Sequence, residues 1–412
     1  MTGKRYRLLI VSAHPTQYGG PLLRRLAADS RLDLHVAYCS LQGAESGVDP
    51  EFGVAVEWDV PLLDDYAWTL VRNRFRKPTL GKFWGLVNLG LWDLVRKGEY
   101  DAVVLWTGYR YASFWIALIA AKLSGKAVLF GTDASELRAR DGRAWKSALK
   151  RWLWPVLFRL ADVVILPSTR GMELMQSLGL PAHRLALTPY VVDNDWWSER
   201  VAKVERAAVR RQWGIPEDAA VVLFCAKLQS WKRPQDLLRA FAGSRMQNAY
   251  LVFCGEGPMR TELEIEARSL GLDGHVRFIG FTNQTQLPGV YCASDLMVLP
   301  SEYEPFGVVV NEAMLCGCPV VVSDRVGAGY DLVRAGENGF VAPFDNVAAL
   351  AAILKEALGA PARLRTFGEM ARRRMREWAP GNYINAMVEA VGRATKGRKV
   401  RGYETVESPN DL

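Results

Sequence analysis

Long apolar runs are absent from this sequence of 412 residues. Its longest nearly apolar stretch, residues 111–121, falls well short of the ~20 residues that a membrane-spanning helix needs. Residues 1–5 lead directly into the apolar run 8–11, without the separate apolar segment and cleavage site of a signal peptide. We therefore expect a cytoplasmic protein with no signal peptide and no helix across the membrane.

Metal-binding patterns are scarce as well. The six cysteines are scattered, and the closest pair, Cys316 and Cys318, has one intervening residue where a zinc pair has two to four. The four histidines are isolated, and no Asp-x-Asp motif lies in a plausible place for a metal. The sequence thus predicts a reduced protein without a structural metal.

Signatures of two other classes of protein are missing. A dinucleotide-dependent oxidoreductase would need Gly-x-Gly-x-x-Gly after a strand and an acid ~20 residues later, and neither half of the chain has this fingerprint. The net charge of +8 comes without a helix-turn-helix, zinc or RNA-binding signature, so nucleic acid is the least supported partner. An anionic membrane face and acidic small substrates remain as explanations of the charge.

The positive residues gather in two stretches, 72–77 and 138–159, and the second interleaves bases with aromatic residues. Two interpretations of this second stretch stay open. Basic residues with tryptophan suit a helix at the level of lipid headgroups, which would give peripheral contact with an anionic membrane. An amphipathic helix whose aromatics pack on its own domain, with its bases in water, explains the same pattern.

Short apolar runs rich in β-branched residues alternate with helix-period segments throughout the chain. This alternation is typical of parallel sheets that are buried on both faces. The chain length suits two such domains better than one. The expected strands are 8–12, 34–38, 102–106, 127–131, 163–167 and 185–187 in the first half, and 220–225, 250–254, 276–279, 296–299 and 320–323 in the second.

We place the domain boundary close to residue 195. Residues 1–195 would form the first doubly wound, Rossmann-like domain and residues 196–378 the second, which begins with a charged helical segment at 200–213. The helical pattern breaks at 378–383, and the tail 396–412 is polar and expected to be loose. Ligands of such sheets bind at the carboxyl ends of the strands, so two facing domains would share one cleft.

The segment 301–314 carries the most informative motif. An apolar strand runs into a Pro-Phe-Gly turn, and Glu304 and Glu312 lie eight residues apart across it. We expect a helix to begin near Pro305, because proline suits the first helical position, and to place Glu312 about two turns along. The free N–H groups of such a helix suit a phosphate, and ionised carboxylates accept hydrogen bonds from hydroxyls. The motif therefore indicates a nucleotide sugar as ligand.

This segment resembles the E-x7-E element of the retaining GT-B glycosyltransferases, in particular glycosyltransferase family 4. Other segments match that family in order and spacing, namely residues 225–234, 253–258, 278–280 and 317–321. The resemblance implies a GT-B fold, an α/β architecture of two facing Rossmann-like domains with doubly wound parallel sheets. It also implies a C-terminal helix, within residues 379–395, that crosses back onto the first domain.

The resemblance implies roles for residues of the second domain. Lys227 and Lys232 would neutralise the donor diphosphate and, with Glu304, form the catalytic set. The family usually has arginine at the first of these positions, so Lys227 gives up bidentate geometry. Glu312 would accept hydrogen bonds from the ribose hydroxyls. The other expected donor contacts in this domain are Gly255, Gly257, Ile279, Phe306, Gly307, Val308 and Val309.

In the first domain, Gly19 and Gly20 match the family's glycine pair, which lets the loop approach the donor phosphate. His14 and Gln17 flank that loop and would contact the acceptor or the sugar, whereas a lone histidine more often satisfies local hydrogen bonds. Many relatives carry a sugar-contacting histidine near residues 131–135, where this chain has none. We expect Asp133 to take over a polar contact there, and this departure leaves the identity of the sugar open.

The activity that the resemblance implies is transfer of a sugar from a nucleoside-diphosphate sugar to an acceptor hydroxyl, with the anomeric configuration retained. No cofactor and no metal would be required, since the lysine pair neutralises the diphosphate. The acceptor would be a glycan or lipid-linked molecule of cell-envelope polysaccharide, lipopolysaccharide or glycolipid synthesis, or a small natural product. A sugar-nucleotide epimerase or a phosphorylase of similar architecture is the nearest alternative, and a non-catalytic sugar-nucleotide sensor is a further one.

Overall fold

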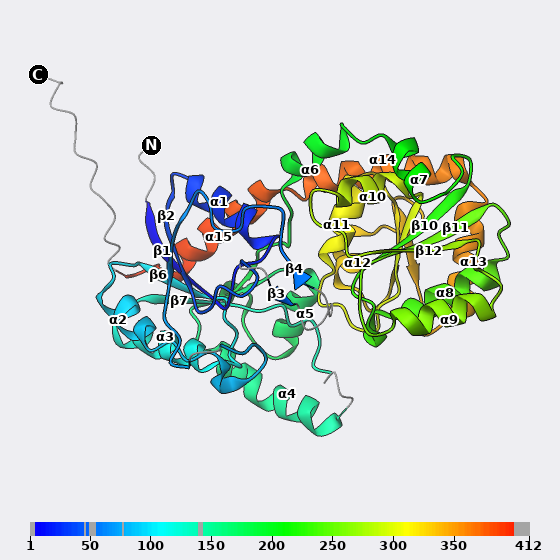
Figure 1. The fold of residues 1–412 in the computed structure, drawn as a ribbon. Coiled ribbons are helices and arrows are strands. Elements are labelled where there is room, and N and C mark those ends of the chain that lie inside the picture. Colours follow the sequence, from blue (N-terminus) through cyan, green and yellow to red (C-terminus); the bar gives the residue numbers. More distant parts are fainter. Residues whose placement is uncertain (1–4, 45–46, 49–54, 76–77, 139–142, 399–412) are drawn as a thin grey trace, which may run out of the picture.

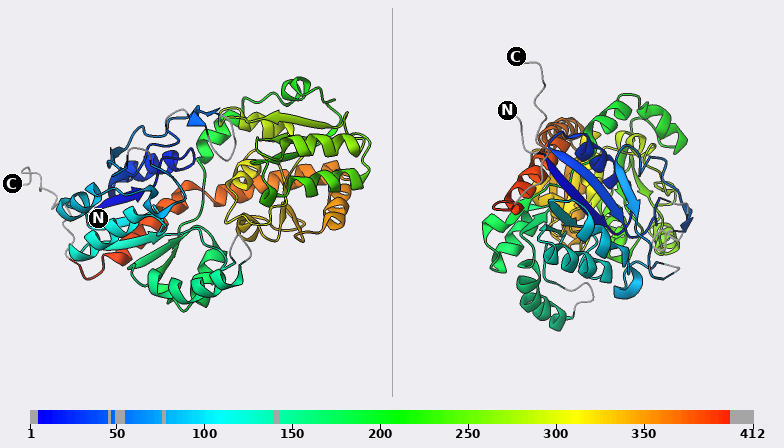
Figure 2. Two further views of the ribbon diagram at one scale, coloured as in Figure 1. Left: turned by 60° about the horizontal axis from the view of Figure 1, so that its bottom comes forward. Right: turned by 90° about the vertical axis from the view of Figure 1, so that its left-hand side faces the viewer.

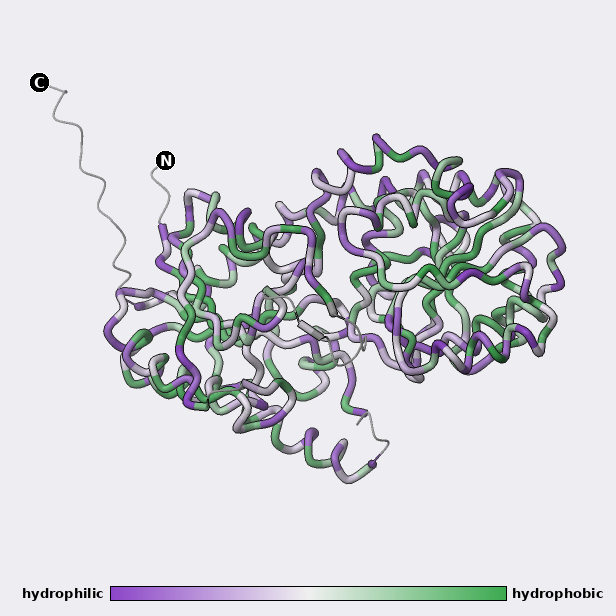
Figure 3. The backbone as a smooth tube through the Cα atoms, viewed as in Figure 1, coloured by the Kyte–Doolittle hydropathy of each residue, from purple (hydrophilic) through white to green (hydrophobic). Residues whose placement is uncertain are grey.

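Two separate parallel sheets organise the chain, one in each half (Figure 1). The computed structural model describes residues 5–44, 47–48, 55–75, 78–138 and 143–398. Apolar strands occupy the centre of each domain, and the more polar segments surround them (Figure 3). The expected fold class, two doubly wound parallel α/β domains, is confirmed.

The first sheet has seven strands in the order β5-β2-β1-β6-β7-β8-β9, and all its pairs are parallel. Its central strands are buried on both faces, as the continuous apolar runs predicted. The strands are β1 (Tyr6–Ser12), β2 (Leu32–Tyr38), β5 (Ala67–Leu70), β6 (Ala102–Leu105), β7 (Ala127–Gly131), β8 (Val163–Leu166) and β9 (Leu185–Leu187).

The second sheet has six parallel strands in the order β12-β11-β10-β13-β14-β15. The strand order reverses next to β10, which is the kind of position where such sheets bind ligands. The strands are β10 (Ala220–Cys225), β11 (Ala249–Cys254), β12 (Val276–Gly280), β13 (Leu296–Leu299), β14 (Val320–Ser323) and β15 (Gly339–Ala342).

Helices cover both faces of each sheet (Figure 1). Side-chain caps start several of them. Ser168 accepts a hydrogen bond from the Gly171 N–H at 3.2 Å, and Asn346 accepts one from the Ala349 N–H at 2.9 Å. The helices of the first domain are α1 (Gly19–Ala28), α2 (Gly90–Lys97), α3 (Ala112–Leu123), α4 (Ala144–Phe158) and α5 (Thr169–Ser177). Those that follow are α6 (Asn194–Val201), α7 (Arg206–Gln212), α8 (Pro234–Ser244), α9 (Arg260–Ser269), α10 (Leu287–Ala293), α11 (Val308–Leu315), α12 (Gly327–Leu332), α13 (Val347–Leu358), α14 (Pro361–Glu377) and α15 (Pro380–Ala394).

All eleven strands expected from the sequence are present, with ends within two residues of the expected ones. The sequence missed β5 and β15. All four residues of β5 are exposed, because it lies at the edge of its sheet, so it lacks the apolar run that marks the other strands. It also missed the two-residue strands β3 (Gly47–Val48) and β4 (Ala55–Val56), which pair with each other in antiparallel fashion.

Helix α15 crosses back from the second domain to the first, as expected. Its residues Met387 and Val391 are fully buried in the same apolar cluster as Leu8 of β1 and Leu129 of β7. The helix thus completes one face of the first sheet, and Figure 2 shows it leaving the second domain for the first. None of the helices in the described part of the chain has both the length and the apolar content needed to cross a bilayer.

The two domains touch along the carboxyl edges of their sheets. The carbonyl oxygen of Tyr190, in the linker, accepts hydrogen bonds from Asn311 Nδ2 at 2.9 Å and from Trp378 Nε1 at 2.6 Å. On another side of the contact, the N–H of Thr169 donates to the Asp331 carboxylate at 3.1 Å. These bonds fix the two edges opposite each other, with the loops that follow the strands between them.

Candidate active site

Three loops at the carboxyl edge of the second sheet are joined by backbone hydrogen bonds. The N–H of Ala226 donates to the Cys254 carbonyl at 3.1 Å, and the N–H of Leu228 donates to the Glu256 carbonyl at 2.9 Å. The N–H of Gly255 donates to the Gly280 carbonyl at 2.8 Å. Residues 226–228, 255–257 and 280 therefore form one rigid rim, which holds half-buried Lys227 at the end of β10.

Gly255 and Gly257 are required by this rim. Gly255 has a φ of +140°, and a Cβ atom there would lie 2.1 Å from the Ala226 carbonyl oxygen. A Cβ on Gly257 would lie 2.5 Å from the Leu228 carbonyl oxygen. Protein backbone fills the space beside both α-carbons, so the fold itself requires glycine here, and the donor contact of these glycines stays a prediction.

Helix α11 begins later than the sequence predicted. It starts at Val308, with Gly307 as its N-cap in a left-handed conformation (φ +97°), so Pro305 lies before the helix and not at its first position. The turn needs glycine for this conformation, and that requirement overrides the start signal of proline. As a result Glu312 lies about one turn inside the helix and not two.

A second glycine holds the turn that carries Glu304. The Gly327 N–H donates to the Glu304 carbonyl at 3.0 Å, and the Ala328 N–H donates to the Phe306 carbonyl at 2.7 Å. A Cβ on Gly327 would lie 2.1 Å from the Pro305 carbonyl oxygen. The start of α12 thus packs directly on the turn and fixes its backbone.

Glu304 and Lys232 form an ion pair at the mouth of the site. Lys232 ends the short 3-10 helix η3 (Ser230–Lys232), and the N–H of Glu302 donates to the Trp231 carbonyl at 2.8 Å, which ties this loop to the Glu304 turn. The side chain of Lys232 is 19% exposed and that of Glu304 is 14% exposed, so the pair is shielded from most of the solvent. The structure therefore brings two of the three predicted catalytic residues into contact.

Glu312 has a different environment, because it is buried with only 5% of its surface exposed. The Tyr291 hydroxyl donates a hydrogen bond of 2.8 Å to its Oε2. Burial raises the pKa of Glu312 to about 7, although the hydrogen bonds from Tyr291 and Gln284 act in the opposite direction. Glu312 lines a narrow cavity between the domains together with Gln17 and Gln284.

The remaining predicted donor contacts of the second domain lie around these two acids. Phe306 is 2% exposed and its ring packs on Tyr190, with 5.2 Å between centroids, so its side chain faces the core and the linker. Val308 and Val309 are half-buried at the start of α11 and pack against the core below it. Ile279 is half-buried at the end of β12 and packs on the same core.

The glycine pair of the first domain opens helix α1. The backbone N–H of Gly19 donates to Thr16 Oγ1 at 3.1 Å, and that of Gly20 donates to the Thr16 carbonyl at 3.0 Å. A Cβ on Gly20 would lie 2.9 Å from the carbonyl oxygen of Leu62. Gly20 therefore permits close packing of this loop on the segment at Leu62, and the approach of the pair to the donor phosphate stays a prediction.

His14 makes the local contact that an isolated histidine commonly makes. Its Nδ1 lies 2.9 Å from the Pro15 carbonyl oxygen, and its own carbonyl accepts a hydrogen bond from Ser12 Oγ at 3.2 Å. Gln17, three residues along the loop, reaches the cavity that Glu312 lines. The structure thus brings Gln17 together with a predicted donor contact of the other domain.

The charges of Asp133 in the first domain and Glu304 in the second act on the same two tyrosines, Tyr18 and Tyr190. Burial raises the pKa of the Tyr18 hydroxyl first, and the charges of Asp133 and Glu304 raise it further. Burial likewise raises the pKa of the Tyr190 hydroxyl, with added contributions from Tyr18, Asp133 and Glu304. Asp133 and Glu304 are therefore both close enough to this tyrosine pair to act on it electrostatically.

Tyr18 and Tyr190 were missed as site residues by the sequence analysis. Their rings meet edge to face with 6.4 Å between centroids. Tyr190 stands in the linker and Tyr18 caps α1, so neither has a spacing or a charge pattern that marks it. Tyr18 follows Gln17 directly, and that position in a predicted site loop is the one signal that could have found it.

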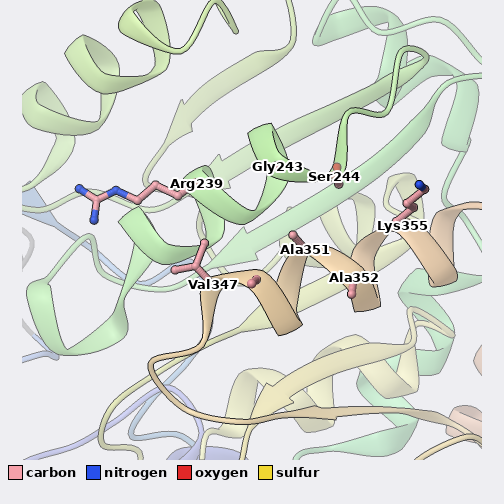
Figure 4. Close-up of a pocket in the computed structure, with 8 residues that line it drawn as sticks. Arg239, Gly243, Ser244, Val347, Ala351, Ala352 and Lys355 are labelled. Carbon is pink, nitrogen blue, oxygen red and sulfur yellow. The ribbon is translucent and has the colours of Figure 1, made fainter.

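A groove in the second domain lies away from these residues. It has a volume of about 510 Å³ and runs between α8 and α13, where Arg239, Val347 and Lys355 line it (Figure 4). None of the predicted site residues borders this groove. We place the candidate site at the contact between the domains, since the charged and polar groups gather there and the groove is lined largely by alanine and aliphatic carbon.

Within the described residues, no three or more His, Cys, Asp or Glu side chains lie close enough to hold a metal ion. Asp193 and Asp195, which form an Asp-x-Asp sequence in the linker, both pair with Arg25 of α1. These two acids join the linker to the first domain.

Two family models match the chain. The Glycosyl transferase 4-like domain matches residues 22–191, and Glycosyl transferases group 1 matches residues 205–374. Together they span most of the chain. The second match contains Lys227, Lys232, Glu304 and Glu312 of the predicted site.

Solved structures share the fold over nearly the whole chain. Anabaena HepE in complex with UDP and glucose is similar with a TM-score of 0.71 and 20% identity, covering 94% of this chain and 100% of that one. Sucrose-phosphate synthase from Thermosynechococcus elongatus is similar with a TM-score of 0.68 and 20% identity, covering 93% and 98%. These likenesses establish the two-domain GT-B fold.

Curated relatives match over shorter segments. A D-inositol 3-phosphate glycosyltransferase of Catenulispora acidiphila is 36% identical over 211 residues, which cover 48% of each chain. The 2-deoxystreptamine glucosyltransferase of Streptomyces kanamyceticus is 29% identical over 220 residues, covering 52% of this chain and 55% of that protein. The chain thus spans about half the length of these curated relatives.

Proposed function

Because the chain belongs to the group 1 glycosyltransferases, as its two family matches show, we propose that it transfers a sugar from a nucleoside-diphosphate sugar to an acceptor hydroxyl with retention of the anomeric configuration. One observation carries the proposal. The Lys232–Glu304 pair and the start of α11 stand together at the carboxyl edge of the second sheet.

The donor would lie along the second domain, with its diphosphate at the lysines. Lys227 and Lys232 supply positive charge where negative charge builds on the leaving β-phosphate, so they act on the transition state more than on the ground state. The N–H groups at the start of α11 add to this charge. We propose that these groups take the role that a divalent metal has in other transferases, so that no metal is required.

The two acids would hold opposite ends of the donor. Glu304, at the mouth, accepts hydrogen bonds from hydroxyls of the transferred sugar, while Glu312, one turn inside α11, accepts them from the ribose. Lys232 would then exchange its contact with Glu304 for the diphosphate. The tyrosine hydroxyls beside Asp133 and Glu304 would border the sugar from the other side.

We propose a front-face reaction. The acceptor oxygen approaches the anomeric carbon from the side on which the phosphate leaves. Its bond to that carbon forms as the bond to the β-phosphate oxygen breaks, and the acceptor proton passes to that oxygen. Retention is inferred from the E-x7-E resemblance. It requires no protein nucleophile, in contrast to the carboxylate that attacks in retaining glycosidases.

The reaction would take place in the cytoplasm, on the inner face of a membrane. All six cysteines are free, which suits a reducing compartment. The basic and aromatic first domain supports a lipid-linked or envelope glycan as acceptor. A small hydroxylated ring is the second candidate, because the relatives matched by sequence are named for inositol phosphate and 2-deoxystreptamine.

A binding screen tests the proposal. Calorimetric titration of the wild type with the UDP, GDP, ADP and dTDP sugar series should show tight binding of one series, and Glu304→Ala should bind the same nucleotide sugars more weakly. A product whose anomeric configuration, measured by NMR, equals that of the donor supports retention. Product formed from glucose 1-phosphate alone would indicate a phosphorylase, and conversion of the donor without an acceptor would indicate an epimerase. Either result contradicts the proposal.

A further inference from the structure

Helix α4 lies at the outer edge of the first domain (Figures 1 and 2). Six large apolar residues in or just after this helix are exposed to solvent. They are Trp145 (59%), Leu149 (47%), Trp152 (81%), Leu153 (54%), Val156 (63%) and Leu160 (39%). Such a concentration on a single helix is unusual for a soluble surface, where large apolar residues are normally scattered.

The six residues share one side of the helix. At 100° per residue, their directions all fall within an arc of about 100° when the helical pattern is continued to Leu160. Trp154 and Phe158 point to the opposite side and Leu157 to one flank, and all three are buried. The helix therefore has two apolar faces, of which its own domain covers only one.

The buried face anchors α4 firmly. The rings of Trp154 and Phe158 pack at 5.8 Å between centroids, and Trp154 Nε1 donates to the Tyr109 hydroxyl at 3.1 Å. Packing on its own domain, one of the two interpretations of this stretch, thus holds for these aromatics. It does not account for Trp145 and Trp152, which the fold leaves in water.

The segment is strongly basic, and one of its bases stands at each edge of the exposed face. Five bases stand between residues 143 and 159, namely Arg143, Lys146, Lys150, Arg151 and Arg159, and the same segment contains no acid, so it carries a charge of +5. On the helical projection, Lys146 borders one edge of the apolar arc and Arg159 the other. An apolar stripe with tryptophan and flanking bases is the composition of helices that lie in the interface of an anionic bilayer.

We propose that this face of α4 is a docking surface for an anionic lipid bilayer. Trp145, Trp152 and the aliphatic residues between them would enter the boundary between headgroups and acyl chains, while the bases contact anionic headgroups. Charge complementarity favours lipid over a second copy of the chain, because two such faces would bring their +5 segments together.

The surface also stands close to the candidate site. Lys150 Nζ donates to the carbonyl of Arg138 at 3.3 Å, and the Arg138 guanidinium pairs with Glu302 across the domain contact at 3.2 Å. Asp133 precedes Arg138 by five residues on the same loop. A bilayer under α4 would therefore present a lipid-linked acceptor beside the opening of the site. This step rests on the proposed function, whereas the docking itself does not.

Flotation with lipid vesicles tests the docking. The full chain should float with vesicles of phosphatidylcholine containing about one third phosphatidylglycerol, and should bind pure phosphatidylcholine vesicles far more weakly. The double variant Trp145→Ser/Trp152→Ser should lose about tenfold or more of its partition coefficient on the anionic vesicles. Lys146→Ala should weaken binding about fivefold, and added salt should weaken the wild type in the same direction.

Ile265→Ser is the matched control, because Ile265 is 57% exposed on α9 of the other domain, and it should bind vesicles as the wild type does. Unchanged melting temperatures would show that the variants fold. The proposal is overturned if the wild type floats equally with anionic and with pure phosphatidylcholine vesicles. It is also overturned if the double tryptophan variant floats with anionic vesicles as well as the wild type does. So does a dimer in solution that the tryptophan variant breaks while vesicle binding stays absent overturn it. Loss of nucleotide-sugar binding with intact flotation would instead count against the proposed function alone.

Discussion

The turn before α11 and the interior of α11 each carry one acid of the same motif, and the surroundings of the two acids differ sharply. Glu304 stands on a glycine-held turn and pairs with Lys232, a charge of opposite sign. Glu312 is buried and accepts a hydrogen bond from Tyr291, a neutral group. The two acids are only eight residues apart. Glu304 is held by a neighbouring positive charge, whereas burial makes ionisation of Glu312 unfavourable.

Under the proposed function, this difference gives the two acids different work. An ion pair at the mouth can open when a diphosphate competes for the lysine, so Glu304 would belong to the part of the site that changes during turnover. A buried group with a hydroxyl partner keeps its position, so Glu312 would belong to the part that holds the nucleoside. Substitutions at these acids and around them test this contrast.

Lys232→Ala should lower kcat by about 10²–10³, because it removes a fixed positive charge from the leaving phosphate and leaves Glu304 without its partner. The measurement is initial rates with a saturating nucleotide sugar. Lys355→Ala is the matched control, since Lys355 borders the larger groove between α8 and α13, and its rate should equal that of the wild type. A lower rate in Lys355→Ala would indicate that the active site lies in that groove and not at the domain contact.

Glu312→Gln should change how stability depends on pH. Burial raises the pKa of Glu312 from 4.5 to about 7. Between pH 4.5 and pH 7, Glu312 therefore keeps its proton in the folded state and has lost it in the unfolded state. Stability then falls as pH rises through this window, by up to about 3 kcal/mol for this group. The free energy of unfolding, measured in urea from pH 4 to pH 8, should decline less with rising pH in the variant than in the wild type.

Tyr291→Phe sharpens the same test. The Tyr291 hydroxyl favours the ionised form of Glu312, so its removal should raise the pKa further and extend the decline to higher pH. A difference curve between wild type and Glu312→Gln that is flat from pH 4 to pH 8 would contradict the account of Glu312.

Gly327→Ala should destabilise the fold by about 1–3 kcal/mol, because its Cβ would lie 2.1 Å from the Pro305 carbonyl oxygen and push the Glu304 turn. Thermal or urea unfolding measures this loss, and a fall in kcat should accompany it. Gly381→Ala is the control, since nothing lies within 4 Å of a Cβ at that helical position. It should leave the protein as stable as the wild type or slightly more stable.

Arg138→Ala should have the smallest effect. Its ion pair with Glu302 joins the two domains, but the side chains are 48% and 37% exposed. Pairs of this kind contribute about 0.2–1 kcal/mol, so the free energy of unfolding should hardly change. A loss of several kcal/mol would show that the domain contact depends on this pair.

The sequence predicted most of the fold because its strands are continuous apolar runs in both domains. The prediction missed β5, because all four of its residues are exposed and it therefore has no apolar run. It also placed the start of α11 too early. The proline signal near Pro305 was visible in the sequence, whereas the left-handed conformation of Gly307 results from the packing of the turn on Gly327.

The candidate site divides in the same way. Family spacing brought Lys232 to Glu304, and the structure places them in contact. Spacing could not show that Gly255 faces protein backbone, that Tyr291 holds Glu312, or that Tyr190 packs on both Tyr18 and Phe306. These contacts join segments far apart in the chain, and only the tertiary arrangement creates them.

The contrast between the two acids is tested most directly by titrating two ligands, a nucleotide sugar and its free nucleoside diphosphate, into Glu304→Ala and Glu312→Ala. If Glu304 holds the sugar and Glu312 the ribose, Glu304→Ala should weaken binding of the nucleotide sugar and leave the free diphosphate bound equally well or more tightly. Glu312→Ala should weaken both ligands by the same factor. The opposite pattern, with the diphosphate lost in Glu304→Ala and retained in Glu312→Ala, would contradict these assignments.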